Sequence, residues 1–198
     1  TDGSVVAVRQ YAEEHEASVI SVLNMSFSQG VEQCMNAGLD LAIGDFVYEF
    51  DSIERDWDWA LLFDVYVKSL EGYDIVCALN RKRKNSVSQH FFYWLFNKYA
   101  HIQHTIHNHS FSLITRRGIN RVRSLTKTVP FRKALYANCG LNLYNLEFVS
   151  SGSEWKNATS ISPEQSYSSL ILFTDLAYKF AFTMTIIMTA IILLVVVY

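Results

Sequence analysis

The 198-residue chain has little proline, few cysteines and no excess of basic charge. Half of its residues are apolar and only two are proline, which is the composition of a globular domain with enough material for one core. Cys34, Cys77 and Cys139 are far apart and odd in number, so they predict buried thiols in a reducing compartment rather than a disulfide framework. A net charge of −2 gives no global basic field, which argues against nucleic acid as a partner.

Charge is also absent from residues 180–198. A helix of this length reaches about 28 Å, close to the hydrocarbon thickness of a bilayer, and apolar side chains on every face are unlike an ordinary core helix. The sequence therefore predicts one transmembrane helix at 180–198, preceded by an amphipathic segment at 166–179 that lies on the membrane surface. The polar N-terminal residues carry no signal-peptide pattern, and Lys179 lies just before the apolar run, so the folded part is predicted to be cytoplasmic.

Short helical and extended patterns alternate before this tail, which is typical of a mostly parallel sheet with helices on both faces. Predicted strands cover 18–23, 45–51, 73–79 and 110–115, and predicted helices cover 5–16, 29–41, 57–70, 86–100 and 118–125. In such sheets ligands bind beyond the carboxyl ends of the strands. Asp51 follows one such end and residues 80–84 follow another, so we expect the two to face one pocket.

Several short motifs occur along the chain in a fixed order. The longest is QGVEQCMNAGLDLAIGDFVYEFDS at 29–52; the others are DGS at 2–4, EGYDIV at 71–76 with the basic run RKRK after it, FSLITRR at 111–117 and FTDLAYK at 173–179. Together they resemble the family 2 glycosyltransferases. The closest resemblance is to the membrane-associated branch that includes dolichol-phosphate mannosyltransferase and bacterial polyprenyl-phosphate glycosyltransferases.

The resemblance implies a GT-A fold, an α/β, Rossmann-like domain with a mostly parallel sheet and flanking helices, at residues 1–155. A linker with an amphipathic juxtamembrane helix at 156–179 and the transmembrane helix at 180–198 would follow. The implied activity is inverting transfer of a hexose from a nucleotide-diphosphate sugar to a polyprenyl (dolichyl or undecaprenyl) phosphate at the cytoplasmic membrane face, for cell-envelope or polysaccharide biosynthesis. The family's opening strand precedes its DGS turn and a second transmembrane helix usually follows the first, so we expect this chain to be a fragment or abbreviated product.

The resemblance places Asp51 at the first position of the family's metal-binding Asp-x-Asp motif, whose second position is Ile53 here. Glu49 lies two residues before Asp51, on the same face of a strand, and Asp56 lies just beyond it. Either is a candidate to complete a site for Mg²⁺ or Mn²⁺, which would neutralise the leaving diphosphate. The alternative is a solvated acidic turn at the start of a helix.

Four cations suit phosphate, because they give permanently charged or bidentate contacts: Arg116, Arg117, Arg132 and Lys133. The resemblance implies that such residues line the diphosphate and the lipid phosphate, and that Asp2 contacts the base or ribose. Asp51, Arg117 and Arg132 are thus the predicted catalytic residues, and Asp2, Asp51, Arg116 and Arg117 the predicted donor-binding residues. A plain turn at Asp2 and a solvated or membrane-facing basic patch are the alternatives.

Two other features leave alternatives open. The aromatic residues of 91–96 are too dense for one core face, so some are expected to touch lipid or a neighbouring subunit of a homo-oligomer. The histidines of 101–109 have spacings that could ligate zinc, but a polar loop is favoured because no cysteine or carboxylate joins them. The competing functional hypothesis is a degenerate, non-catalytic glycosyltransferase-like module anchored to a membrane, which Ile53 and the missing strand motivate.

Overall fold

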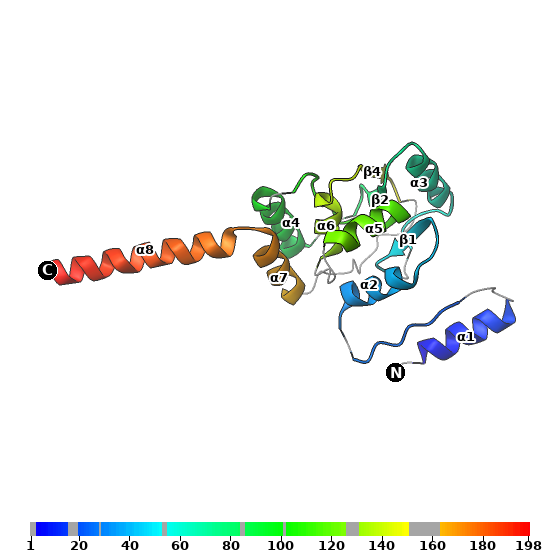
Figure 1. The fold of residues 1–198 in the computed structure, drawn as a ribbon, viewed down its shortest axis with the longest axis horizontal. Coiled ribbons are helices and arrows are strands. Elements are labelled where there is room, and N and C mark those ends of the chain that lie inside the picture. The colour runs from blue at the N-terminus through cyan, green and yellow to red at the C-terminus, as the bar shows by residue number, and fades with distance from the viewer. Residues whose placement is uncertain are drawn as a thin grey trace. The chain divides into compact units, whose positions relative to one another are not determined.

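The computed structural model describes residues 3–15, 20–27, 29–52, 55–83, 86–100, 102–125, 131–150 and 163–198. It divides into two compact units, Thr1–Leu41 and Ala42–Tyr198. The first unit contains helices α1 (Ser4–Glu14) and α2 (Val31–Leu41), both predicted from the sequence. The second unit contains the sheet and the other helices (Figure 1).

The strand predicted at 18–23 does not form in its described part. Residues 20–23 have no regular secondary structure, and Ile20, Val22 and Leu23 are exposed. A strand needs a neighbour to satisfy its backbone N–H and C=O groups, and no strand of the described sheet pairs with this segment. The prediction is therefore wrong for these residues.

The second unit is built on a four-stranded sheet. Its strands are β1 (Phe46–Phe50), β2 (Ile75–Asn80), β3 (Phe111–Thr115) and β4 (Leu143–Phe148), in the order β1-β3-β2-β4. β3 runs antiparallel to β1 and β2, whereas β4 runs parallel to β2. The carboxyl ends of β1, β2 and β4 therefore meet at one edge, here called the carboxyl edge, and β3 ends at the opposite amino edge. The predicted α/β class is confirmed, and the mixed sheet fits a GT-A-like domain.

Alternation along the strands gives the sheet two different faces. One face packs against α3 (Ala60–Leu70) and forms a core that includes Val65, Val76 and Leu113. The other face is covered by α5 (Arg116–Leu125) and α6 (Arg132–Asn138). Burial of both faces by helices is what the alternating pattern of the sequence predicted.

Helix α4 (Val87–Tyr99) begins at a capping box. Ser86 Oγ accepts from the Gln89 backbone N–H at 3.3 Å, and Gln89 Oε1 accepts from the Ser86 N–H at 3.2 Å, so both orphan donors are satisfied. Phe92 and Phe96 on the inner face of the helix pack against Phe131, the N-cap residue of α6. This cluster is the second core of the unit.

Two helices follow the linker residues. Helix α7 (Pro163–Phe173) packs on the α4 cluster through Leu170 and Phe173, and a backbone bridge joins Ala100 to Thr174. Helix α8 (Leu176–Val197) has 22 residues, of which Lys179 alone is charged, and none of them is buried. Its length and composition suit a membrane span, which supports membrane anchoring. The helix starts at Leu176 rather than at the predicted residue 180, so Lys179 belongs to its first turn.

The three cysteines are free thiols, as predicted, but only two are buried. Cys77 and Cys139 lie in the second unit, and burial raises the pKa of the Cys77 thiol to about 12. Cys34 on α2 is exposed, which corrects the prediction that all three are buried. A thiol with so high a pKa is not a nucleophile at neutral pH.

The close approach of α5 to β3 requires glycine at residue 118. A Cβ added there would lie 2.7 Å from Cγ1 of Ile114, a fully buried side chain. We therefore expect Gly118→Ala to destabilise the chain by about 1–3 kcal/mol despite its better helix propensity. Urea unfolding of the detergent-solubilised chain measures the change. Gly38→Ala is the control, because a Cβ at Gly38 on α2 meets nothing within 4 Å. Equal stability of both variants would contradict the packing.

Candidate functional site

Two acidic residues at the end of β1 meet two basic residues at the start of α6. Arg132 Nη1 lies 3.1 Å from Glu49 Oε2, and Arg132 Nη2 lies 2.7 Å from Asp51 Oδ1. Lys133 Nζ lies 3.1 Å from Asp51 Oδ2. The side chains of Arg132 and Glu49 are only 3% exposed, so each charge depends on its partners. These ion pairs fix α6 to the carboxyl edge of the sheet.

Glu49 is enclosed beneath Arg132. The Tyr136 hydroxyl donates to Glu49 Oε1 at 2.7 Å, and Ser112 Oγ donates to Oε2 at 3.1 Å. Burial raises the pKa of Glu49, while Arg132 and the Tyr136 hydrogen bond oppose the shift. Ser112 is the register partner of both Glu49 and Cys77, so these residues form a buried polar row across the sheet under α6. Both oxygens of Glu49 are thus used within the protein.

Asp51 is the more accessible carboxylate of the pair, with a side chain 17% exposed. Burial alone would raise its pKa, but the charges of Lys133 and Arg132 together hold the pKa of Asp51 well below its usual range. Asp51 is therefore ionised at neutral pH. Each of its oxygens contacts a cation, Oδ1 with Arg132 and Oδ2 with Lys133.

His109 is a buried residue whose ring is influenced by Arg83, Arg132 and Lys133, three cations here called the positive region. Burial lowers its pKa well below the ordinary histidine value, and Lys133, Arg132 and Arg83 lower it further, against the opposing effect of Asp51. Arg83 Nη1 lies 3.5 Å from the His109 carbonyl oxygen, to which it donates. The neutral imidazole thus lies within electrostatic reach of three cations and one carboxylate. Such a field favours an anion.

The segments that follow β1 and β2 are joined directly. Asp56 Oδ2 accepts from Asn80 Nδ2 at 2.8 Å and from Ser110 Oγ at 3.0 Å. Asn80 Oδ1 in turn accepts from the Lys82 backbone N–H at 3.0 Å. These contacts join the segments beyond the two strand ends, but Asp51 does not line the pocket that Asn80 and Arg83 line, so the expectation that both ends face one pocket is not met there. The Asp56 carboxylate is thus hydrogen-bonded to one side-chain amide and one hydroxyl group.

A pocket of about 520 Å³ opens at the end of β2. It lies between α4 and residues 106–108, and Asn80, Arg83, Tyr93, Trp94, Asn97 and Lys98 are among its lining residues. Asp51 is not in the lining. Tyr93 links the two regions, because it lines the pocket and also interacts electrostatically with Lys133. Arg83, alone among the three cations that act on His109, thus lines a pocket large enough for a small ligand.

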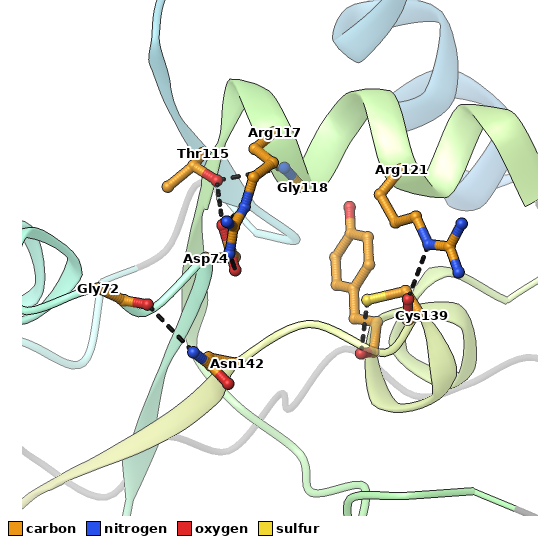
Figure 2. A network of polar contacts seen from close by, with 9 residues as sticks. Gly72, Asp74, Thr115, Arg117, Gly118, Arg121, Cys139 and Asn142 are labelled. Carbon is orange, nitrogen blue, oxygen red and sulfur yellow. Dashed lines mark hydrogen bonds and ion pairs between the residues drawn. The ribbon is translucent and has the colours of Figure 1, made fainter.

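Arg116 and Arg117 do not belong to this cluster. They follow β3, whose antiparallel direction places them at the amino edge, opposite Asp51. Figure 2 shows Arg117 beside Asp74, to which its Nε donates at 2.7 Å. Arg116 donates to the backbone carbonyls of Ala42 and Gly44. The expectation that these two arginines share a site with Asp51 is thus corrected by the direction of β3.

The fit of a divalent cation can be judged from the donor atoms. In the part of the chain that the structure describes, no group of three or more His, Cys, Asp or Glu residues is arranged to hold a metal ion. Asp51 contacts two cations, Glu49 is enclosed, and Asp56 accepts from an amide and a hydroxyl. The arrangement does not fit Mg²⁺ or Mn²⁺ as it stands. Asp2, the predicted nucleoside contact, and His101 lie outside the described residues.

Comparison with known proteins adds two relatives. No protein-family model matches the chain. A protein of Synechocystis sp. named as an uncharacterized glycosyltransferase is 30% identical over 135 residues, which cover 66% of this chain and 41% of that protein. A Bacillus subtilis protein, also named as an uncharacterized glycosyltransferase, is 25% identical over 135 residues, covering 66% of this chain and 42% of that protein.

The chain thus spans less than half the length of each of these curated relatives. Both carry the glycosyltransferase name, and the similarity covers two thirds of this chain. The comparisons support a glycosyltransferase family for the chain. They do not distinguish the polyprenyl-phosphate branch from other branches.

Arg132→Met tests the ion pairs that hold α6. The substitution keeps most of the side-chain volume but removes the cation paired with Glu49 and leaves Asp51 with Lys133 as its cationic partner. Because an unpaired buried charge is costly, we expect a loss of about 3–5 kcal/mol at pH 7 in urea unfolding. The control is Arg121→Met on α5, an exposed residue whose Nε donates to the Cys139 carbonyl at 3.0 Å, where about 1 kcal/mol is expected. A loss no greater than that of the control would show that Arg132 is not the anchor of α6.

His109→Gln tests the positive region through the pH dependence of stability. The folded ring stays neutral, whereas the unfolded ring takes up a proton near pH 6.5, so the unfolded state binds more protons and wild-type stability falls on acidification. Protonation of His109 in the unfolded state lowers the free energy of unfolding by at most about 1.4 kcal/mol for each pH unit below 6.5. His109→Gln removes it and should flatten the decline between pH 7 and pH 5.

Urea unfolding at the two pH values measures this difference. Glu49, whose raised pKa acts in the opposite direction, is present in wild type and variant and cancels. His107→Gln is the control, because His107 is an exposed residue of the same segment and should keep the wild-type decline. An equal decline in His109→Gln and wild type would mean that residue 109 is protonated in the folded state.

Proposed function

We propose that the chain is the donor-binding and membrane-attached part of a glycosyltransferase. It would move a hexose from a nucleotide-diphosphate sugar to a polyprenyl phosphate at the cytoplasmic membrane face, in cell-envelope or polysaccharide biosynthesis. The glycosyltransferase relatives support sugar transfer, and α8 supports the membrane location. The sequence motifs are the support for the lipid acceptor.

The observation that carries the proposal is that Arg132 and Lys133 both pair with Asp51 at the carboxyl edge, while Arg83 donates to the backbone of His109, whose ring all three cations influence. A diphosphate is a compact anion, and guanidinium and ammonium groups bind phosphate oxygens by charge-assisted hydrogen bonds. The carboxyl ends of parallel strands are the usual place for a nucleotide in an α/β sheet. The adjoining 520 Å³ pocket supplies room for the rest of the substrate.

The proposed reaction is a single displacement at the anomeric carbon. An oxygen of the acceptor phosphate forms the new bond to this carbon, while the bond to the donor diphosphate breaks and the nucleoside diphosphate leaves with the electron pair. A phosphate oxygen is already anionic near neutral pH, so it needs no general base. The cations of the carboxyl edge would stabilise the negative charge that grows on the leaving diphosphate.

A metal ion remains a prediction from the sequence, and no step is assigned to it here. Asp51 would have to release Lys133 or Arg132 before it could bind a divalent cation, since both of its oxygens contact them. A donor diphosphate could take over those cations. If this exchange is required, a divalent cation binds Asp51 poorly in the absence of the donor. Titration of the chain with Mn²⁺ alone and with Mn²⁺ plus nucleoside diphosphate tests this.

One observation favours the competing function, a non-catalytic module. The ion pairs of Asp51 satisfy the residue without any ligand, as expected for a degenerate site that serves only structure. Such a module would keep the fold and α8 but would bind no sugar donor. The two functions differ in nucleotide binding.

Arg83→Gln is the most informative variant for this distinction, since Arg83 lines the pocket and is not one of the partners in the ion pairs that Arg132 and Lys133 make with Glu49 and Asp51. We expect the Kd of the detergent-solubilised chain for uridine or guanosine diphosphate to rise about tenfold, which is the effect of losing one charge-assisted hydrogen bond. Isothermal titration calorimetry, with and without Mn²⁺, measures the Kd. Arg81→Gln is the matched control, because Arg81 pairs with Glu147 at 2.9 Å and should change the Kd less than about twofold.

The same preparation allows a transfer assay with radiolabelled nucleotide sugars and polyprenyl phosphate. Label in the lipid extract that falls with Arg83→Gln and not with Arg81→Gln supports the enzyme. Absence of nucleotide binding in the wild-type chain under all these conditions contradicts the proposed donor site and favours the non-catalytic module.

A further inference from the structure

The outer face of α4 carries an apolar stripe that the domain leaves exposed. Val87, Phe91 and Trp94 recur at intervals of four and three residues, so they lie on one side of the helix. They are 88%, 59% and 49% exposed, and the rings of Phe91 and Trp94 stack with centroids 6.0 Å apart. Lys98 continues the row, with its Nζ 4.9 Å from the Trp94 ring centroid. These four residues are called the α4 stripe below.

The carboxyl end of α4 is fixed to the start of α8. The Phe96 ring lies 6.0 Å from the Phe173 ring at the end of α7, and Ala100 forms a backbone bridge with Thr174. Thr174 immediately precedes Asp175, the N-cap residue of α8. If α8 crosses a bilayer, these contacts keep the end of α4 at the level where the chain enters the membrane.

The chemistry of α4 suits a lipid surface. Trp and other aromatic residues favour the membrane interface, and Lys can extend its charge to the headgroups while its stem stays among apolar groups. The helix sequence VSQHFFYWLFNKY contains no Asp or Glu, so nothing on α4 repels an anionic lipid. Helix α7, which joins the α4 cluster to α8, also exposes apolar and aromatic side chains, namely Tyr167, Ile171 and Leu172.

We propose that the α4 stripe docks on the membrane beside α8, with Phe91 and Trp94 in the interfacial layer and Lys98 at the headgroups of anionic lipids. The domain then contacts the membrane through α4 as well as through α8. Two contacts fix the orientation of the domain relative to the bilayer, whereas a single flexible anchor does not. Because Trp94 and Lys98 also line the 520 Å³ pocket, this orientation opens the pocket at the lipid surface. Entry of a lipid-linked acceptor through this opening is the one part of the inference that rests on the proposed function.

Tryptophan quenching by brominated lipids tests the docking directly. The chain is reconstituted into vesicles of phosphatidylcholine and phosphatidylglycerol whose acyl chains carry bromine near the headgroup. The chain has four tryptophans, Trp57, Trp59, Trp94 and Trp155. Each single-tryptophan variant keeps either Trp94 or Trp59 and carries phenylalanine at the other three positions. We expect the emission of Trp94 to fall about twofold and that of Trp59 to change little. Trp59 is the matched control, because it is 65% exposed but precedes α3.

Two further variants separate insertion of α8 from docking of α4. Phe91→Glu should restore most of the Trp94 emission, whereas Phe63→Glu, at an equally exposed aromatic residue of α3, should not. Lys98→Gln should abolish the increase of Trp94 quenching with the phosphatidylglycerol content. Resistance of each variant to extraction at alkaline pH shows that α8 is still inserted.

Trp94 that stays unquenched while α8 is inserted overturns the proposal, as does equal quenching of Trp94 and Trp59. A neighbouring subunit is the other occupant that could cover the stripe. In that case the emission of Trp94 would change when the protein is diluted in the vesicles and would not respond to the brominated lipid. That result also contradicts membrane docking. None of these measurements needs a sugar donor, so their outcome is independent of the transferase assay.

Discussion

The ion pairs that Arg132 makes with Glu49 and Asp51 are the constraint on which the rest of the site depends. Helix α6 has only seven residues and no side-chain cap, so its own hydrogen bonds do little to place it. A guanidinium removed from water needs carboxylate partners, and two are supplied by Glu49 of β1 and by Asp51, which follows β1 and lies two residues after Glu49 on the same face. With α6 fixed in this way, Lys133 faces Asp51, and Tyr136 one turn later reaches Glu49. The positive region beside the pocket follows from this short helix.

The direction of the strands decides which charged residues can act together. β1 and β2 end at the carboxyl edge, where Asp51 and Arg83 follow them, whereas β3 ends at the amino edge and carries Arg117 to Asp74. The amino-edge pair joins the start of α5 to Asp74, just before β2. Helix α4 then connects the carboxyl edge to α8, since one of its faces lines the pocket and its end contacts the residues before α8. Pocket, positive region and apolar span are thus linked through one helix.

The sequence predicts most elements that have strong periodicity, including β1, β2, α4 and α8. It does not predict α6 or β4. In β4 the alternating Tyr144, Leu146 and Phe148 pack on the α3 core, but the strand has only six residues and its pairing with β2 is not visible in the sequence, whereas α6 is held by tertiary ion pairs rather than by helix propensity. Asp51 and Arg132 are each predicted as site residues, but they are 81 positions apart and no local signal reveals their contact. His109 is missed as a site residue for the same reason, and Arg117 is misplaced because sequence alone does not give the direction of β3.

The central claim is that the anion site of the chain lies at the carboxyl edge, where the α6 cations meet β1. An experimental structure of the chain with a nucleoside diphosphate bound tests it most directly. The account predicts that the diphosphate oxygens lie within hydrogen-bond distance of Arg83, Arg132 or Lys133, next to His109. A diphosphate bound at the amino edge, on Arg116 and Arg117, would contradict it.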